Sequence, residues 1–191
     1  MDPRMMDKAL KYPTSRYLAL IAGFTALYLV YGYASGTVLG HTIFELDLFF
    51  LISALFTILV ALTRRNWSAT VLATINGLLL FGDPNAPPAI GLSLIPNGLV
   101  FDLALRWRRD HEDKISAMQF LIAGALGNLA MAVSGLLIAD AGGALNLSGI
   151  PFLVSVAVAL VGNPIVGALG ALFGTVVVKR VGERVKSPLE R

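Results

Sequence analysis

FELDLFFLISALFTILVALTRR, residues 44–65, is the stretch of this sequence that decides its fold class. An apolar run of about 20 residues has the length of an α-helix that crosses a bilayer. Acidic residues stand at the start of this run, at Glu45 and Asp47, and two arginines follow its end, at Arg64 and Arg65. The stretch therefore predicts a transmembrane helix that carries opposite charges at its two ends.

The composition of the whole chain agrees with a membrane environment. Of its 191 residues, 56% are hydrophobic and only 14% are charged, whereas a soluble domain carries about 25% charged residues because water must cover its surface. The chain contains no cysteine. A disulfide scaffold, thiolate catalysis and cysteine-ligated metal are therefore excluded.

Five further apolar runs are candidates for helical crossings, although the third run of the chain is short, and turn or charged residues separate them. The last apolar stretch is too long for one crossing, and Gly162-Asn163-Pro164 is expected to divide it. We therefore expect 140–160 to form an outer loop or a re-entrant segment. The chain is predicted to be one membrane domain over 1–191, with spans at about 17–34, 44–62, 67–82, 89–107, 115–139 and 161–178.

All 15 lysine and arginine residues fall in the segments that this span count places on one side of the membrane. Lys and Arg collect in cytoplasmic loops. The predicted fold class is therefore an all-α integral membrane protein of the cell membrane, a six-transmembrane-helix bundle with both termini cytoplasmic. The net charge of +3 is then an orientation signal, and no nucleic-acid partner is expected.

Acidic and aromatic residues make the outer side a candidate ligand site. Glu45 and Asp47 lie among apolar residues, where an ionised carboxylate needs a partner or a water-filled cavity. A cationic ligand would be such a partner. Tyr31, near the outer end of the first span, would stack on a ring-shaped ligand or belong to an interfacial aromatic belt. His41, in the first outer loop, would contact the ligand or be solvated.

Asp102 lies inside the fourth span, toward its inner end. Arg106 follows it by four residues, the spacing at which side chains on a helix meet. An ion pair that helps to dock the helix is the simpler interpretation, and a ligand contact is the alternative.

Four asparagines lie on four different predicted spans, each near the middle or in the outer half. A buried amide is unfavourable unless it is hydrogen-bonded. The amides either bond to one another across the bundle or surround a polar pocket that opens to the outside, where serines would join them. Amides donate and accept, which suits a heterocyclic or hydroxylated solute. The residues concerned are Asn76, Asn97, Asn128, Asn163, Ser93, Ser134 and Ser155.

Small residues form a flat face on the first span, at Ala19, Ala22, Gly23 and Ala26. Such a face lets another helix approach closely. That helix would belong either to the bundle itself or to a separate membrane partner. Gly167, Gly170 and Gly174 on the last span allow the same two interpretations.

Several catalytic patterns are absent from the sequence. It has no Walker A motif, no His-Glu-x-x-His pair and no Gly-x-Ser-x-Gly elbow. We therefore expect a protein that is not an enzyme, with no cofactor and no metal site.

The sequence resembles the substrate-binding S components of energy-coupling factor (ECF) vitamin transporters. The likeness covers nearly the whole chain, and four stretches carry it: 19–26, Arg64-Arg65-Asn66-Trp67, Ile95-Pro96-Asn97-Gly98-Leu99-Val100-Phe101-Asp102, and 162–170 with the basic tail after it.

The resemblance implies a subunit that captures a water-soluble vitamin or precursor from outside, such as thiamine or a pyrimidine-like solute. It also implies docking, through Ala22 and Ala26 of the first span, to a transmembrane coupling subunit that carries two ATPase subunits. Two other functions stay open: a stand-alone small-solute permease, and a membrane assembly or scaffold protein.

Overall fold

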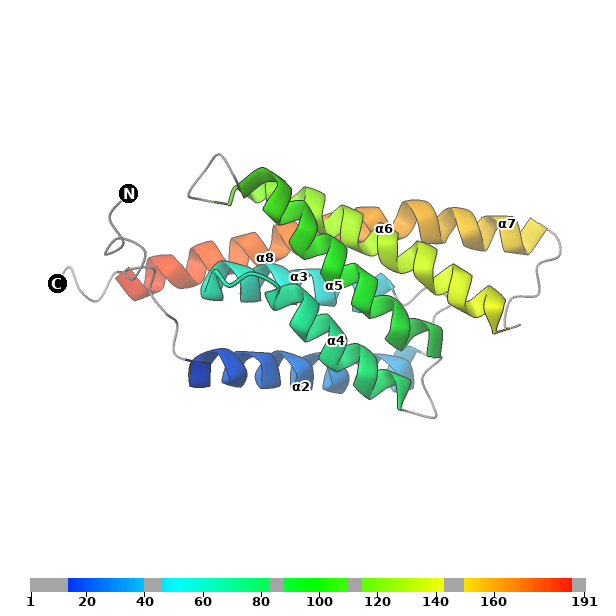
Figure 1. Ribbon diagram of the computed structural model, residues 1–191, viewed down its shortest axis with the longest axis horizontal. Coiled ribbons are helices and arrows are strands. Elements are labelled where there is room, and N and C mark those ends of the chain that lie inside the picture. Colours follow the sequence, from blue (N-terminus) through cyan, green and yellow to red (C-terminus); the bar gives the residue numbers. More distant parts are fainter. Residues whose placement is uncertain (1–13, 40–45, 83–87, 110–114, 143–149, 187–191) are drawn as a thin grey trace.

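The computed structural model describes residues 14–39, 46–82, 88–109, 115–142 and 150–186, and within these ranges every element is a helix (Figure 1). The elements are α2 (Thr14–Leu39), α3 (Leu46–Thr63), α4 (Ser68–Phe81), α5 (Pro88–Arg109), α6 (Ala117–Ala141), α7 (Ile150–Ala157), the π-helical turn η1 (Val158–Gly162) and α8 (Asn163–Lys186).

Five stretches of these helices are long and apolar enough to cross a membrane: Ser15–Ser35, Leu46–Thr63, Pro88–Trp107, Ala117–Ala141 and Val158–Val181. The sixth apolar helix, α4, has 14 residues and rises about 21 Å, which is less than the roughly 30 Å of bilayer hydrocarbon. Over the described residues the coarser part of the predicted fold class is confirmed: every element is a helix, and several of the helices are apolar and long enough to cross a membrane.

The long helix at the carboxyl end covers part of 140–160, where the sequence predicts an outer loop or a re-entrant segment. Its described part is helical from Ile150 onward, and α7, η1 and α8 follow one another without a break (Figure 1). Pro164 has no N–H to donate to the carbonyl group one turn earlier, at Leu160. The helix accommodates this residue with a π-helical turn over Val158–Gly162 rather than with a chain break.

Close backbone contacts between helices hold the bundle together. The helix pairs α5–α6, α3–α8, α4–α5 and α6–α8 form the main interfaces. Gly124 of α6 and Gly167 of α8 face each other so closely that a methyl group on either would overlap the carbonyl oxygen of the other. Gly170 makes the same kind of approach to the backbone of Phe50 on α3. Glycine is required at these crossings because any Cβ atom would push the helices apart.

From α2 to α6 successive helices run in opposite directions, and α7, η1 and α8 together run back, so α2 starts and α8 ends at the same end of the bundle (Figure 1). We call this the basic end, because the turn between α3 and α4 and the last turn of α5 also lie there. The lysines and arginines with described side chains all belong to it: Arg16, Arg64, Arg65, Arg106, Lys179 and Arg180. The opposite end, with Asp47 and Asp140, is called the acidic end.

Candidate functional site

The acidic end brings two predicted ligand residues together where α2 meets α3. The hydroxyl of Ser35 on α2 donates a hydrogen bond to Oδ2 of Asp47 on α3. The Tyr31 side chain also interacts with the Asp47 carboxylate. Asp47 stands in the first turn of α3, where a negative charge is favoured by the free N–H groups of the helix. The other two predicted residues of this site, His41 and Glu45, lie outside the described residues.

Asn128 of α6 is the centre of a buried amide cluster. Its Oδ1 accepts hydrogen bonds from Asn97 Nδ2 at 3.0 Å and from Ser53 Oγ at 3.2 Å. Its Nδ2 donates to the carbonyl oxygens of Asn163 at 3.2 Å and Phe49 at 3.3 Å. A side-chain amide offers two donors and two acceptor lone pairs. All four sites of Asn128 are therefore used, and this one side chain joins α6 to α3, α5 and α8.

Asn97 and Asn163 complete the cluster. Asn97 is fully buried on α5, and its Nδ2 also lies 3.3 Å from the Met131 sulfur. Asn163 is 4% exposed at the start of α8. Among the described residues, the Oδ1 atoms of both side chains have no hydrogen-bond partner. Of the four predicted amides, Asn97 and Asn128 thus bond to each other across the bundle, while two acceptor atoms within this cluster have no partner among the described residues.

The other polar residues predicted for the site do not join this cluster through any observed hydrogen bond. Asn76 Nδ2 donates to the carbonyl oxygen of Leu72 on its own helix, at 2.9 Å. Ser93 and Ser134 likewise donate to carbonyl oxygens one turn earlier on α5 and α6. The side chain of Ser155 lies outside the described residues. The ligand roles of Asn76, Ser93 and Ser134 remain predictions.

The small-residue face of α2 is exposed along its length. Ala19, Ala22, Gly23 and Ala26 are all exposed, and no described atom lies within 4 Å of a Cβ added to Gly23. The opposite face of the same helix carries its buried residues, Ile21, Thr25 and Tyr28. Only 17% of the membrane-length part of α2 is buried, against 50% for α3. Helix α2 therefore lies at the edge of the bundle and presents this flat face outward.

The glycines of the last helix have the opposite environment. Gly167, Gly170 and Gly174 are buried, and their partners are Gly124, Phe50 and Ala54 of the bundle. Each of the two interpretations that the sequence left open for small residues thus applies to a different helix. Those on α8 pack inside the bundle, and those on α2 remain available to a partner.

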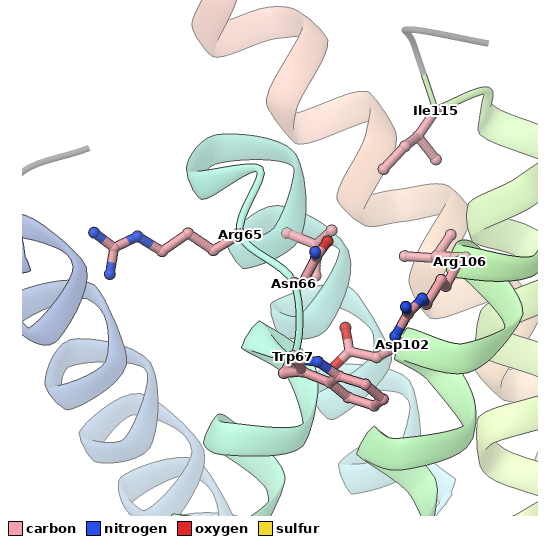
Figure 2. Close-up of a pocket in the computed structure, with 8 residues that line it drawn as sticks. Arg65, Asn66, Trp67, Asp102, Arg106 and Ile115 are labelled. Carbon is pink, nitrogen blue, oxygen red and sulfur yellow. The ribbon is translucent and has the colours of Figure 1, made fainter. Parts of the chain in front are cut away.

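A pocket at the basic end was not predicted from the sequence. It lies among the last turn of α3, the turn between α3 and α4, the last part of α5 and Ile115, two residues before α6 (Figure 2). The turn that forms one wall holds two residues in the left-handed region, Arg64 with φ 50° and Trp67 with φ 65°, a conformation that is costly for bulky residues. The lining residues are Val60, Arg65, Asn66, Trp67, Asp102, Leu105, Arg106 and Ile115.

Asp102 links the two helices beside this pocket. Its Oδ2 lies 2.7 Å from both the backbone nitrogen and the hydroxyl of Thr70 on α4, and the side chain is 8% exposed. The sequence spacing suggested a role for Asp102 along its own helix, with Arg106. The contact with Thr70 connects two helices, so spacing within one helix could not reveal it.

Comparison with known proteins finds no family model, no curated protein and no solved structure that matches this chain. Among the described residues, no group of three or more His, Asp or Glu side chains is placed to hold a metal ion.

Proposed function

We propose that this protein is the substrate-capture subunit of an ECF-type transporter. It would bind a water-soluble vitamin or precursor at the acidic end, which faces the outside. A transmembrane coupling subunit and two ATPase subunits would then drive uptake of the ligand. In this proposal α4 completes six membrane crossings and both termini are cytoplasmic, in agreement with the gathering of the described basic side chains at one end.

The exposed small-residue face of α2 is the observation that carries the proposal. The described glycines at helix crossings of α4, α5, α6 and α8 are packed against other helices, whereas Ala22, Gly23 and Ala26 lie on the exposed face of α2. Helices in lipid associate through close van der Waals contact between small residues. A flat face at the edge of the bundle is therefore suited to a second membrane protein, and the coupling subunit is the partner we propose.

The polar group at the acidic end supports ligand capture. The Asp47 carboxylate, with Ser35 and Tyr31 beside it, provides an anion and a neighbouring aromatic ring. Both attract a cationic ring-shaped solute. A thiamine-like or pyrimidine-like ligand has this chemistry.

Docking is tested by co-purification of the tagged chain with its coupling subunit and ATPases. The double variant Ala22→Leu/Ala26→Leu fills the flat face and is expected to lose the complex while the isolated subunit remains folded. Ala157→Leu is the matched control, because Ala157 is an exposed alanine on α7. Equal complex formation by both variants would contradict docking through α2.

Transport and binding assays separate the other two functions. Uptake of solute by the purified chain alone in liposomes would establish the stand-alone permease. A thermal-shift screen with vitamins is expected to show stabilisation that grows with ligand concentration. A screen with no stabilising ligand would favour the scaffold protein.

A further inference from the structure

We propose that the pocket at the basic end binds the phosphate headgroup of an anionic lipid. This proposal requires only that the bundle lies in a membrane, and it is independent of the proposed transport function. The pocket opens where α4 begins and α5 ends, and its walls carry charged, polar and apolar side chains in close proximity (Figure 2).

The charge at this end of the bundle favours an anion. Arg65 and Arg106 both line the pocket, and the described lysines and arginines all belong to the same end. Arginine pairs well with phosphate because its guanidinium donates several hydrogen bonds in one plane. Basic pockets between transmembrane helices are suited to anionic headgroups.

Asp102 is the acidic residue in the lining, and its carboxylate is already hydrogen-bonded to α4. Its Oδ2 accepts hydrogen bonds from the backbone N–H and the hydroxyl of Thr70, at the start of α4, where free N–H groups favour a negative charge. Figure 2 shows Arg106 one helical turn after Asp102 on α5, while Arg65 extends toward α2. Arg65 lies there over the ring of Tyr17, 4.7 Å from its centroid. Arg106 is therefore the cation that we assign to the phosphate.

Aromatic residues place the pocket at the depth of the headgroups. Both tryptophans of the chain lie at this end. Trp67 is in the pocket wall with Arg106 above its ring, 5.9 Å from the centroid, and Trp107 is 87% exposed beside Arg106. Tryptophan concentrates at the boundary between hydrocarbon and water. A phosphate held by Arg106 would thus be a headgroup at its normal depth in the membrane.

The remaining lining offers polar and apolar contacts at the mouth of the pocket to the rest of a lipid molecule. Asn66 supplies a neutral amide next to the arginines, and Leu105 and Ile115 form an apolar part of the wall. A free phosphate ion has no apolar surface to bury against this wall, whereas the glycerol and the first acyl carbons of a lipid have such a surface. This combination of surfaces favours a lipid over a soluble phosphate compound.

The test is native mass spectrometry of the full chain with phosphatidylglycerol or phosphatidylcholine added to the detergent. Wild type is expected to retain phosphatidylglycerol about tenfold more strongly than phosphatidylcholine, and Arg106→Gln is expected to lose this preference, in line with the loss of a charge-assisted pair. Arg180→Gln removes the same charge from an exposed position of α8 and is expected to change retention by less than about twofold. Arg106→Lys, which keeps the charge, is expected to retain part of the preference.

Three outcomes would overturn the proposal. Equal losses in Arg106→Gln and Arg180→Gln would show that the lipid responds to diffuse charge rather than to this pocket. Equal retention of both lipids by wild type would show that the pocket has no preference for an anionic headgroup. Displacement of phosphatidylglycerol by millimolar inorganic phosphate would assign the pocket to free phosphate. A thermal midpoint within a few degrees of wild type confirms that Arg106→Gln is folded. A second variant, Asn66→Leu, leaves Arg106 in place and is expected to weaken retention of phosphatidylglycerol without abolishing it.

Discussion

The Asp102 carboxylate of α5 caps the first turn of α4 through Thr70, with Oδ2 2.7 Å from both the backbone nitrogen and the hydroxyl of that residue. The N-cap residue of α4, Trp67, supplies no side-chain cap of its own. The free N–H groups at the start of a helix need such a partner. Asp102 of the neighbouring helix thus provides the N-terminal cap of α4, which in most helices comes from the residue just before the first turn.

Asp102→Ala is expected to lower the free energy of unfolding by about 1–3 kcal/mol, because the partly buried N–H of Thr70 loses its acceptor and the hydroxyl keeps only the Gly98 carbonyl oxygen. Asp102→Asn keeps one acceptor oxygen and is expected to cost less. Thermal unfolding in detergent measures both variants. Asp140→Asn, at an exposed position, is the control; equal midpoints for Asp102→Ala and this control would show that the cap contributes nothing to stability.

Asn128→Leu is expected to destabilise the bundle, and Asn76→Leu is not. Leucine has the same branch point and the same number of side-chain heavy atoms as asparagine, so both changes keep the shape of the side chain and remove its polar contacts. The first removes four hydrogen bonds between helices, with an expected cost of about 2 kcal/mol. The second removes one bond within α4 and a buried oxygen, Oδ1, that has no partner among the described residues.

Chemical denaturation of the two asparagine variants provides the measurement. If Asn76→Leu proves as destabilising as Asn128→Leu, the centre of the polar network is misassigned. A loss of ligand stabilisation in Asn76→Leu without a loss of fold would identify Asn76 as a ligand residue.

Gly167→Ala is expected to destabilise the protein by about 1–3 kcal/mol, because the added methyl group overlaps the carbonyl oxygen of Gly124 and the side chain of Asn128. Gly23→Ala is the matched control on the exposed face of α2, where a Cβ meets no described atom within 4 Å. It is expected to be neutral or to stabilise the helix by up to about 1 kcal/mol. The thermal midpoints of the two variants, measured side by side, provide the test. A lower midpoint for Gly23→Ala than for Gly167→Ala would contradict the packing role of Gly167 and the exposed position of Gly23.

Asp47→Asn is expected to weaken binding of a cationic ligand by about tenfold or more through the lost charge. The fold should change little, because the amide can still accept the hydrogen bond from Ser35. Ligand-dependent thermal shifts measure the effect. Asp140→Asn removes the same charge from the end of α6 and serves as the control; equal weakening by the two variants would show attraction by the whole acidic end.

The sequence predicted much of the helical framework. Apolar runs bounded by charged or turn residues predict helices because each backbone polar group must be satisfied within the helix when lipid surrounds it. The predicted spans 44–62 and 89–107 begin and end within about two residues of α3 and α5. The segment before α8 was harder to predict, because a proline in a long apolar stretch is compatible with either a break or a π-helical turn.

The candidate site was predictable as a set of residue types and not as a set of contacts. Asn97 and Asn128 were recognisable because amides are costly in an apolar helix, yet only the structure shows that they bond to each other while Asn76 bonds to its own helix. The small residues were likewise recognisable in the sequence, but their contacts were not. The faces of α2 and α8 look equivalent in the sequence, and one is exposed while the other is buried.

The sequence by itself determined that the chain forms apolar helices of membrane-spanning length, where several of them begin and end, and that basic and acidic residues are separated. These features depend on local composition and spacing. Only the tertiary structure decided which polar groups are satisfied, which small-residue face stays open, and that Asp102 caps α4. Each of these depends on the neighbour that a side chain meets across a helix interface. That neighbour is distant in the sequence, and no local pattern specifies it.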